Sequence, residues 1–129
     1  MANPNIVGVT EIKGNFSSVT ANTGSGVQSV MMVENLASSG EIYKINTILA
    51  TNKNTDTANE VTVCHYAAEK MGGARNEIAH RITVPAQSTL IVMDKSTSIY
   101  LKENQSLGCN AQGNASIVVH TSWEEISAS

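Results

Sequence analysis

The three histidines are the side chains of this sequence best suited to hold a metal ion, but their spacing does not suggest a shared site. His65, His80 and His120 fall in three separate strand-like stretches. Metal-binding histidines usually come as close pairs supported by a nearby carboxylate, and this pattern is missing. We therefore expect no metal and no cofactor, and we interpret the histidines as scattered, partly exposed side chains.

Two cysteines are the candidate nucleophiles. A catalytic cysteine needs a histidine as base and a carboxylate that orients this histidine. Cys64 and His65 are neighbours on a predicted strand, so their side chains point to opposite faces. Cys109 has no histidine close to it in the sequence. We expect both to be buried thiols, as in a protein assembled in the cytoplasm, with a Cys64–Cys109 disulfide as the alternative.

The carboxylates and glycine-rich segments do not form a catalytic motif either. Glu124 and Glu125 are adjacent on a predicted strand and therefore face opposite sides. The glycines at 24–26 and 71–75 are not followed by the Lys-Ser/Thr pair of a phosphate-binding loop. We therefore expect that the protein is not an enzyme.

Composition indicates a single folded domain with few charges. The chain has 129 residues, 15% of them charged, and a net charge of −3. A chain of this length can bury enough surface to fold without a disulfide or a metal. It has no basic cluster for nucleic acid and no apolar stretch of about 20 residues that would cross a membrane. Residues 1–5 also lack the pattern of a signal peptide. From these three observations together, we expect neither nucleic acid nor a membrane as a partner.

Alternating apolar residues and turn signals predict about nine or ten short antiparallel strands. Their spacing of about 8–12 residues is typical of an all-β fold, a β-sandwich or a jelly-roll-like barrel, with little helix. We expect one domain over residues 6–129. The predicted strands are 6–13 with a continuation at 16–20, 27–34, 41–51, 60–66, 77–84, 89–94, 98–102, 105–111 and 115–126.

Three local features refine this prediction. The apolar side of strand 41–51 switches near Asn46–Ile48, which predicts a bulge. Residues 67–76 are predicted to form a long loop or a short helical turn. In strand 77–84, simple alternation would place Ile78, His80 and Ile82 on one face.

The first five residues are predicted to form an extended arm in front of the domain. Pro4 disfavours a helical conformation in the residue before it. An extended arm can add a strand to the sheet edge of a neighbouring molecule, and a frayed terminus is the alternative. The candidate interface residues are Ala2, Asn3, Pro4, Asn5 and Ile6.

Short blocks of the sequence resemble virion proteins of tailed bacteriophages, especially phages of cyanobacteria and marine bacteria. The blocks are Met1–Val7, Lys44–Asn52, Ser98–Leu107 and Ser122–Ile126. The resemblance implies a head decoration (cement) protein: a homotrimer in the virion that binds a major capsid or other virion protein and is assembled in the host cytoplasm. A neck, collar, tail or fibre module of such a phage is the alternative.

A carbohydrate-binding β-sandwich is a further hypothesis from a different class. Such a protein needs several exposed aromatic rings on one face. The candidates are Tyr43, Tyr66, Tyr100 and Trp123. Three of these rings together on a solvent-facing patch would support carbohydrate binding, and their burial would count against it.

Overall fold

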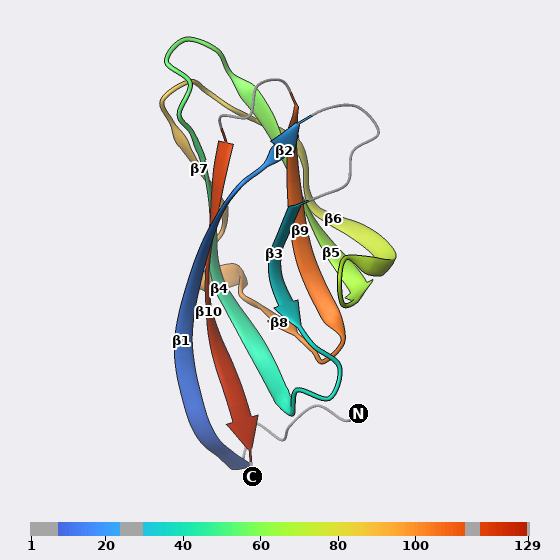
Figure 1. The fold of residues 1–129 in the computed structure, drawn as a ribbon. Helices are drawn as coiled ribbons and strands as arrows, with labels where there is room; N and C mark the ends of the chain where they lie inside the picture. The colour runs from blue at the N-terminus through green and yellow to red at the C-terminus, as the bar shows by residue number, and fades with distance from the viewer. Residues whose placement is uncertain (1–7, 24–29, 113–116, 129) are drawn as a thin grey trace.

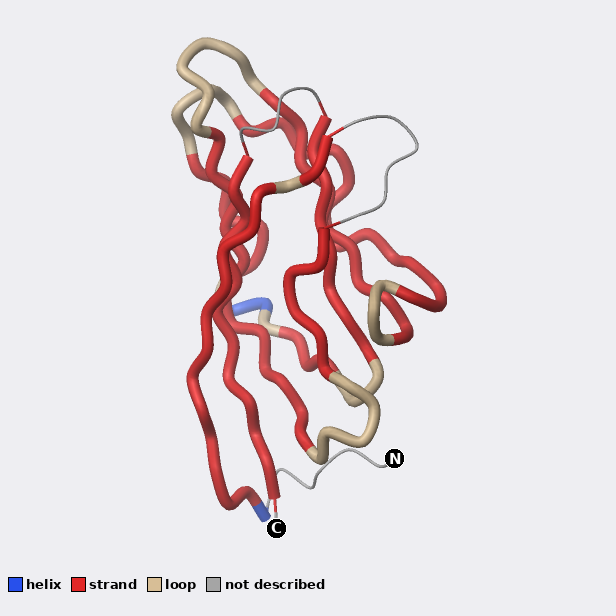
Figure 2. Tube along the Cα trace, viewed as in Figure 1, coloured by secondary structure: helices blue, strands red, loops and turns tan. Residues whose placement is uncertain are grey.

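A computed structural model describes residues 8–23, 30–112 and 117–128. Strands make up most of these residues (Figure 2). The predicted arm at 1–5 lies outside them and stays a prediction. The same holds for its candidate interface residues, Ala2, Asn3, Pro4, Asn5 and Ile6.

The described residues contain ten strands in two sheets that pack face to face (Figure 1). In sheet A, β1 pairs with β10, β10 pairs with β4, and β7 and β8 follow each other along the free side of β4. In sheet B, β2 and β3 pair with β9, β9 pairs with β5, and β5 pairs with β6. The bounds are β1 Val9–Thr20, β2 Asn22–Thr23, β3 Val30–Asn35, β4 Glu41–Asn52, β5 Asn59–Ala68, β6 Gly72–Val84, β7 Thr89–Met93, β8 Ile99–Leu101, β9 Gln105–Gln112 and β10 Ile117–Ala128.

This arrangement confirms the predicted all-β sandwich. A 3₁₀ helix, η2 (Lys95–Thr97), follows β7 and is capped by the side chain of Asp94. One detail departs from the prediction, because β2 pairs with β9 in parallel rather than antiparallel orientation.

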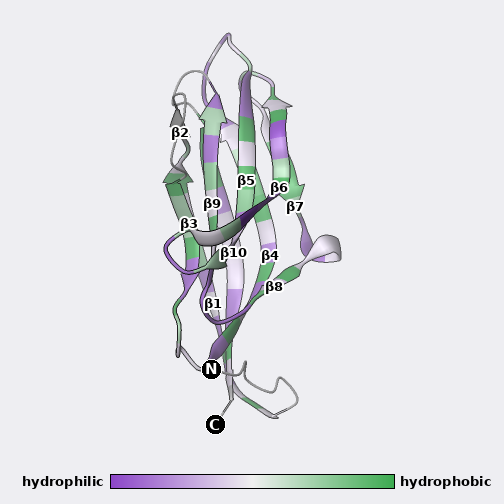
Figure 3. Ribbon diagram, turned by 90° about the vertical axis from the view of Figure 1, so that its right-hand side faces the viewer, coloured by the Kyte–Doolittle hydropathy of each residue, from purple (hydrophilic) through white to green (hydrophobic). Residues whose placement is uncertain are grey.

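The core lies between the two sheets and is built from the inward-facing side chains of each strand. Alternation of apolar and polar residues along the strands is visible in Figure 3. Burial of this apolar surface is the main favourable term in folding, at about 25 cal/mol per Å². Fully buried members include Ile45, Ile48 and Leu101 in sheet A, and Val61, Val63 and Leu107 in sheet B.

The predicted bulge in β4 is confirmed at Asn46. Strand β10 pairs Ser122 with Thr47 and Trp123 with Ile45, so Asn46 is the additional residue. The extra residue allows Ile45 and Ile48 to face the core together, although they are three positions apart. This explains why the apolar side of the strand switches in the sequence.

The predicted long loop at 67–76 is wrong. Residues Glu69–Met71 form a tight turn, and β6 begins at Gly72, whose N–H donates to the oxygen of Glu69 (3.1 Å). Gly73 adopts φ +71°, a conformation that glycine reaches without steric cost. The polar residues after the turn belong to an edge strand, where side chains are exposed and no apolar alternation is required.

Strand β6 is irregular. Its 13 residues lie opposite the 10 residues of β5, and the register between the two strands shifts three times. Ile82 pairs with Val61, but Ala79 pairs with Val63, so a residue is inserted between them. The prediction that Ile78, His80 and Ile82 share a face by simple alternation is therefore wrong. Arg81 lies at this bulge with φ +51°.

The turn of the β5–β6 hairpin folds over the outer face of sheet B (Figure 3). The N–H of Met71 donates to Ser106 Oγ (2.9 Å), which itself donates to the oxygen of Ala68 (2.8 Å). The N–H of Lys70 donates to Glu34 Oε2 in β3 (2.7 Å). The turn of the hairpin is therefore hydrogen-bonded to β9 and β3 across the outer face of sheet B.

Candidate interaction surface

The structure does not bring the predicted histidines together. His65 is in β5 and His80 in β6, both in sheet B, whereas His120 is in β10 of sheet A. In the described part of the chain, no three His, Cys, Asp or Glu side chains are placed to hold a metal ion. His120 has a surface role: its ring stacks on Phe16 with centroids 5.9 Å apart, and its Nδ1 lies 2.8 Å from Ser18 Oγ.

Both cysteines are buried free thiols, as predicted. Cys109 belongs to the core between the sheets, and burial raises its pKa to about 12. Burial also raises the pKa of Cys64. A thiol with a raised pKa stays protonated at neutral pH and is a poor nucleophile.

The neighbouring carboxylates of β10 face opposite sides of sheet A, as predicted. Glu124 lies in register between Gly14 and Lys44, and Glu125 between Lys13 and Tyr43. Glu125 Oε2 accepts one hydrogen bond from Asn15 Nδ2 (3.0 Å) and another from Trp123 Nε1 (3.1 Å). Its contacts are those of a structural carboxylate that holds two strands together.

The candidate aromatic residues do not form an exposed platform. Tyr43, Tyr66 and Trp123 are buried, and Tyr43 stacks on Trp123 with ring centroids 6.3 Å apart. Tyr100 is 46% exposed. Burial of three of the four rings counts against the carbohydrate-binding hypothesis.

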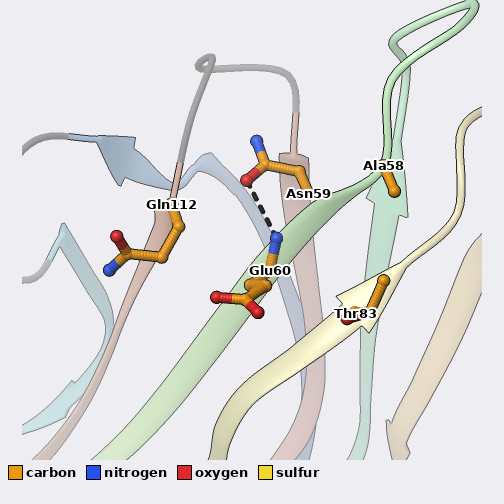
Figure 4. A pocket seen from close by; sticks show the side chains of 5 residues that line it. All are labelled: Ala58, Asn59, Glu60, Thr83 and Gln112. Carbon is orange, nitrogen blue, oxygen red and sulfur yellow. Dashed lines mark hydrogen bonds between the residues drawn. The ribbon is translucent and has the colours of Figure 1, made fainter.

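A shallow surface pocket of about 360 Å³ lies at one end of sheet B (Figure 4). Asn59 Oδ1 accepts a hydrogen bond from the N–H of Glu60 (2.8 Å), and Glu60 Oε1 accepts one from Arg81 Nε (2.8 Å). The described residues of its lining include no histidine or cysteine beside this carboxylate. The lining residues are Ala58, Asn59, Glu60, Thr83 and Gln112.

Large apolar side chains are exposed on the outer face of sheet A, the face turned away from sheet B. Ile12 and Phe16 in β1 are 57% and 60% exposed, and Ile91 in β7 is 62% exposed. Tyr100 in β8 lies on the same face, opposite Lys44. Ile12 and Phe16 lie together on β1, and Ile91 lies at the opposite edge of the sheet. Exposed apolar side chains that lie close together are typical of a protein-binding surface.

Strand β1 offers a long, regular sheet edge on this side of the molecule. It pairs with β10 in unbroken register from Glu11 to Thr20, and no other described strand pairs with its second side. Gly14 does not interrupt it, so the two predicted segments form one strand. The sequence does not reveal this edge, and the one signal of it is that Ile12 and Phe16, four positions apart, share one face of the strand.

The other edges among the described strands are shorter or distorted. The edge formed by β7 and β8 is interrupted by η2, and β6 carries three bulges. Strand β3 shifts register between Met31 and Val33, and the oxygen of Met32 accepts a hydrogen bond from Ser17 Oγ (3.1 Å). Bulges and short edge strands hinder pairing with another chain, which leaves β1 as the edge best formed for it.

No protein-family model and no curated protein matches the sequence. Among the described residues, no helix is long and apolar enough to span a lipid bilayer. A solved structure from Bacillus endospore appendages, described as a family of disulfide-linked pili, has a similar fold with a TM-score of 0.53. The alignment covers 100% of this chain and 96% of that chain at 14% identity, so the likeness is one of fold.

Proposed function

We propose that this chain is a non-enzymatic structural subunit that binds copies of itself and other proteins in a larger assembly. The observation that carries this proposal is the β1 edge, which is long, regular and flanked by exposed apolar side chains. Monomeric β proteins usually shorten, bulge or cover such an edge, because it is ready to pair with another chain. An edge that no other described strand pairs with is suited to assembly.

The positions of the reactive side chains support a structural role. The histidines are distributed over three strands, the thiols are buried, and Glu125 is held by Asn15 and Trp123. Glu125 links β1 to β10, and none of these residues is placed as a nucleophile beside a base.

The particle we propose is a tailed-phage virion, with this chain as a homotrimeric head decoration protein on the major capsid protein. The resemblance of the sequence blocks to phage virion proteins supports this choice. Contacts that are weak singly become strong when they are repeated over a shell. A protein that binds the mature shell alone also stabilises it by mass action. A neck, collar, tail or fibre module is the alternative within the same kind of particle.

A filament subunit is the second candidate, supported by the fold similarity to the endospore appendage protein over nearly both whole chains. Those pili are described as disulfide-linked. Here the sequence has two cysteines, and both are buried free thiols. A filament of this chain would therefore be held by non-covalent contacts between sandwiches.

Cryo-electron microscopy of the particle that carries the chain tests these proposals. Copies spread over a shell would support a decoration protein, whereas a few copies at the portal or tail would support the neck or tail alternative. Filaments formed by the purified chain would support the second candidate. A monomer that joins neither particle nor filament would contradict the structural role.

A further inference from the structure

We propose that β1 binds β1 of a second copy in antiparallel orientation, about a two-fold axis that passes through Gly14. This proposal rests on the structural-subunit function above and specifies one of its contacts. The pairing joins two copies of sheet A into one continuous sheet. It is compatible with higher symmetry, because two-fold axes also relate trimers to one another.

The backbone of β1 can form this pairing after one local hydrogen bond is exchanged. In an antiparallel ladder, alternate residues point their N–H and C=O groups toward each side of the strand. β10 occupies one side of β1, so half of these groups over the regular stretch Glu11–Thr20 face the other side, which no described strand pairs with. One of them, the N–H of Phe16, donates to Asn15 Oδ1 in the single chain (2.8 Å), and the pairing replaces this bond. An axis at Gly14 pairs residues 11–17 with themselves in reverse, entirely within the regular stretch.

The apolar side chains are complementary in this register. Ile12 of one copy lies opposite Phe16 of the other, and the two-fold axis repeats the pair. Both side chains are on the outer face of sheet A and are more than half exposed in the single chain. Directly opposed apolar residues are cross-strand neighbours, which stabilise a sheet through their packing.

The charges are complementary as well. At this end of sheet A, Glu11, Glu41 and Glu125 gather around Lys13, and burial together with the charges of Glu125 and Glu11 raises the pKa of Glu41. In the proposed register, Lys13 of the second copy lies opposite Asn15, whose amide is bonded to Glu125. Lys13 lies 3.6 Å from Glu11 Oε1 of its own chain and, in this register, also comes near Glu125 of the other copy. No like charges are directly opposite each other in the paired stretch.

Gly14 suits the position on the axis. A Cβ built on Gly14 would meet no atom within 4 Å, so the space around it is open. The absence of a side chain lets the two strands approach at the axis. An axis at Ile12 would set Glu11 opposite Lys13, but it would place the register shift between Val9 and Glu11 inside the ladder.

Cysteine cross-linking tests the register. Gly14→Cys should form a disulfide-linked dimer under mild oxidation, because the two Cβ atoms meet at the axis and the native thiols are buried. Gly8→Cys is the matched control, since Gly8 is equally open but faces position 20 of the second copy. Faster cross-linking of Ile12→Cys than of Gly14→Cys would overturn the proposed axis.

Size-exclusion chromatography with multi-angle light scattering tests the contact itself. Phe16→Lys should raise the dissociation constant of the dimer at least about tenfold. Ile91→Lys, on the same face but at the opposite edge, should leave the constant unchanged. If the wild-type chain self-associates but Phe16→Lys has no effect and Gly14→Cys does not cross-link, this contact is wrong and the structural role stands. A wild-type chain that stays monomeric and gives no cross-link overturns this contact as well.

Discussion

The side-chain amide of Asn35 donates a hydrogen bond of 3.0 Å to the backbone oxygen of Leu101 and so joins the end of β3 in sheet B to β8 in sheet A. The same Nδ2 atom donates to the oxygen of Glu41 (2.9 Å), and Ser39 Oγ donates to Asn35 Oδ1 (2.6 Å). Asn52 makes the corresponding link at the other end, from β4 to the oxygen of Val84 (3.0 Å). Two buried asparagines therefore tie the sheets together.

Replacing Asn35 by Ala should lower the free energy of unfolding by about 3 kcal/mol, because buried backbone oxygens lose their donor. Urea denaturation followed by circular dichroism measures this change. Asn76→Ala, at an exposed position of β6, is the control and should stay within about 0.5 kcal/mol of wild type. Equal effects of the two substitutions would show that the Asn35 bonds contribute no specific stability.

Ser106 holds the β5–β6 turn, since its hydroxyl accepts from Met71 and donates to Ala68. Ser106→Ala should release the turn locally, at a cost of about 1–3 kcal/mol for the groups left without a partner. Hydrogen exchange should accelerate at the amides of Lys70 and Met71, while the amides of β4 keep their protection. Unchanged exchange at the turn would mean that its other hydrogen bonds, to Glu34, Asn104 and Ala37, suffice to hold it.

Tyr43 makes the stability of the folded state depend on pH in the alkaline range. Burial, followed by the charges of Glu125, Glu41 and Glu34, raises its pKa to about 12. The pKa of a tyrosine in an unfolded chain is about 10, so the folded state binds the hydroxyl proton of Tyr43 more tightly than the unfolded state. The free energy that protonated Tyr43 contributes to stability is fully present below a pH of about 10. It is lost as the pH rises to about 12.

The Tyr43→Phe variant should therefore lose less stability than wild type across this alkaline window. Urea denaturation at a series of pH values measures the difference. Cys109 titrates in the same direction and remains in the variant, so part of the slope should persist. A variant whose slope equals that of wild type would rule out Tyr43 as a contributor.

The thiols of Cys64 and Cys109 should be unreactive in the folded protein. Because burial raises the pKa values of Cys64 and Cys109, neither should react with Ellman's reagent at neutral pH until the chain unfolds. Both should react in denaturant, whereas the exposed thiol of the Gly8→Cys variant should react at once. Rapid reaction of a native thiol in the folded wild-type chain would contradict the described burial.

The fold class could be predicted because strand alternation and turn residues are local signals. The bulge at Asn46 was visible for the same reason, since the apolar side of β4 changes within the strand itself. By contrast, the start of β6 was missed, because an exposed edge strand has no buried face to impose alternation. The inserted residues of β6, such as the one at Arg81, carry no separate signal.

The candidate surface could not be predicted, because it depends on which strands lie at the edges. Ile12 and Phe16 look like core residues in the sequence, and their exposure follows from the position of β1 beside β10 alone. The abundant asparagines favour turns on average. Asn35 and Asn52 are nevertheless fully buried, because each satisfies its amide with backbone groups from distant strands.

Sedimentation equilibrium of the purified full chain shows whether the protein is a subunit of an assembly. We expect a reversible oligomer whose average mass increases with protein concentration across the micromolar range and decreases in the Phe16→Lys variant. A single monomeric species at every concentration, identical for wild type and variant, would contradict it.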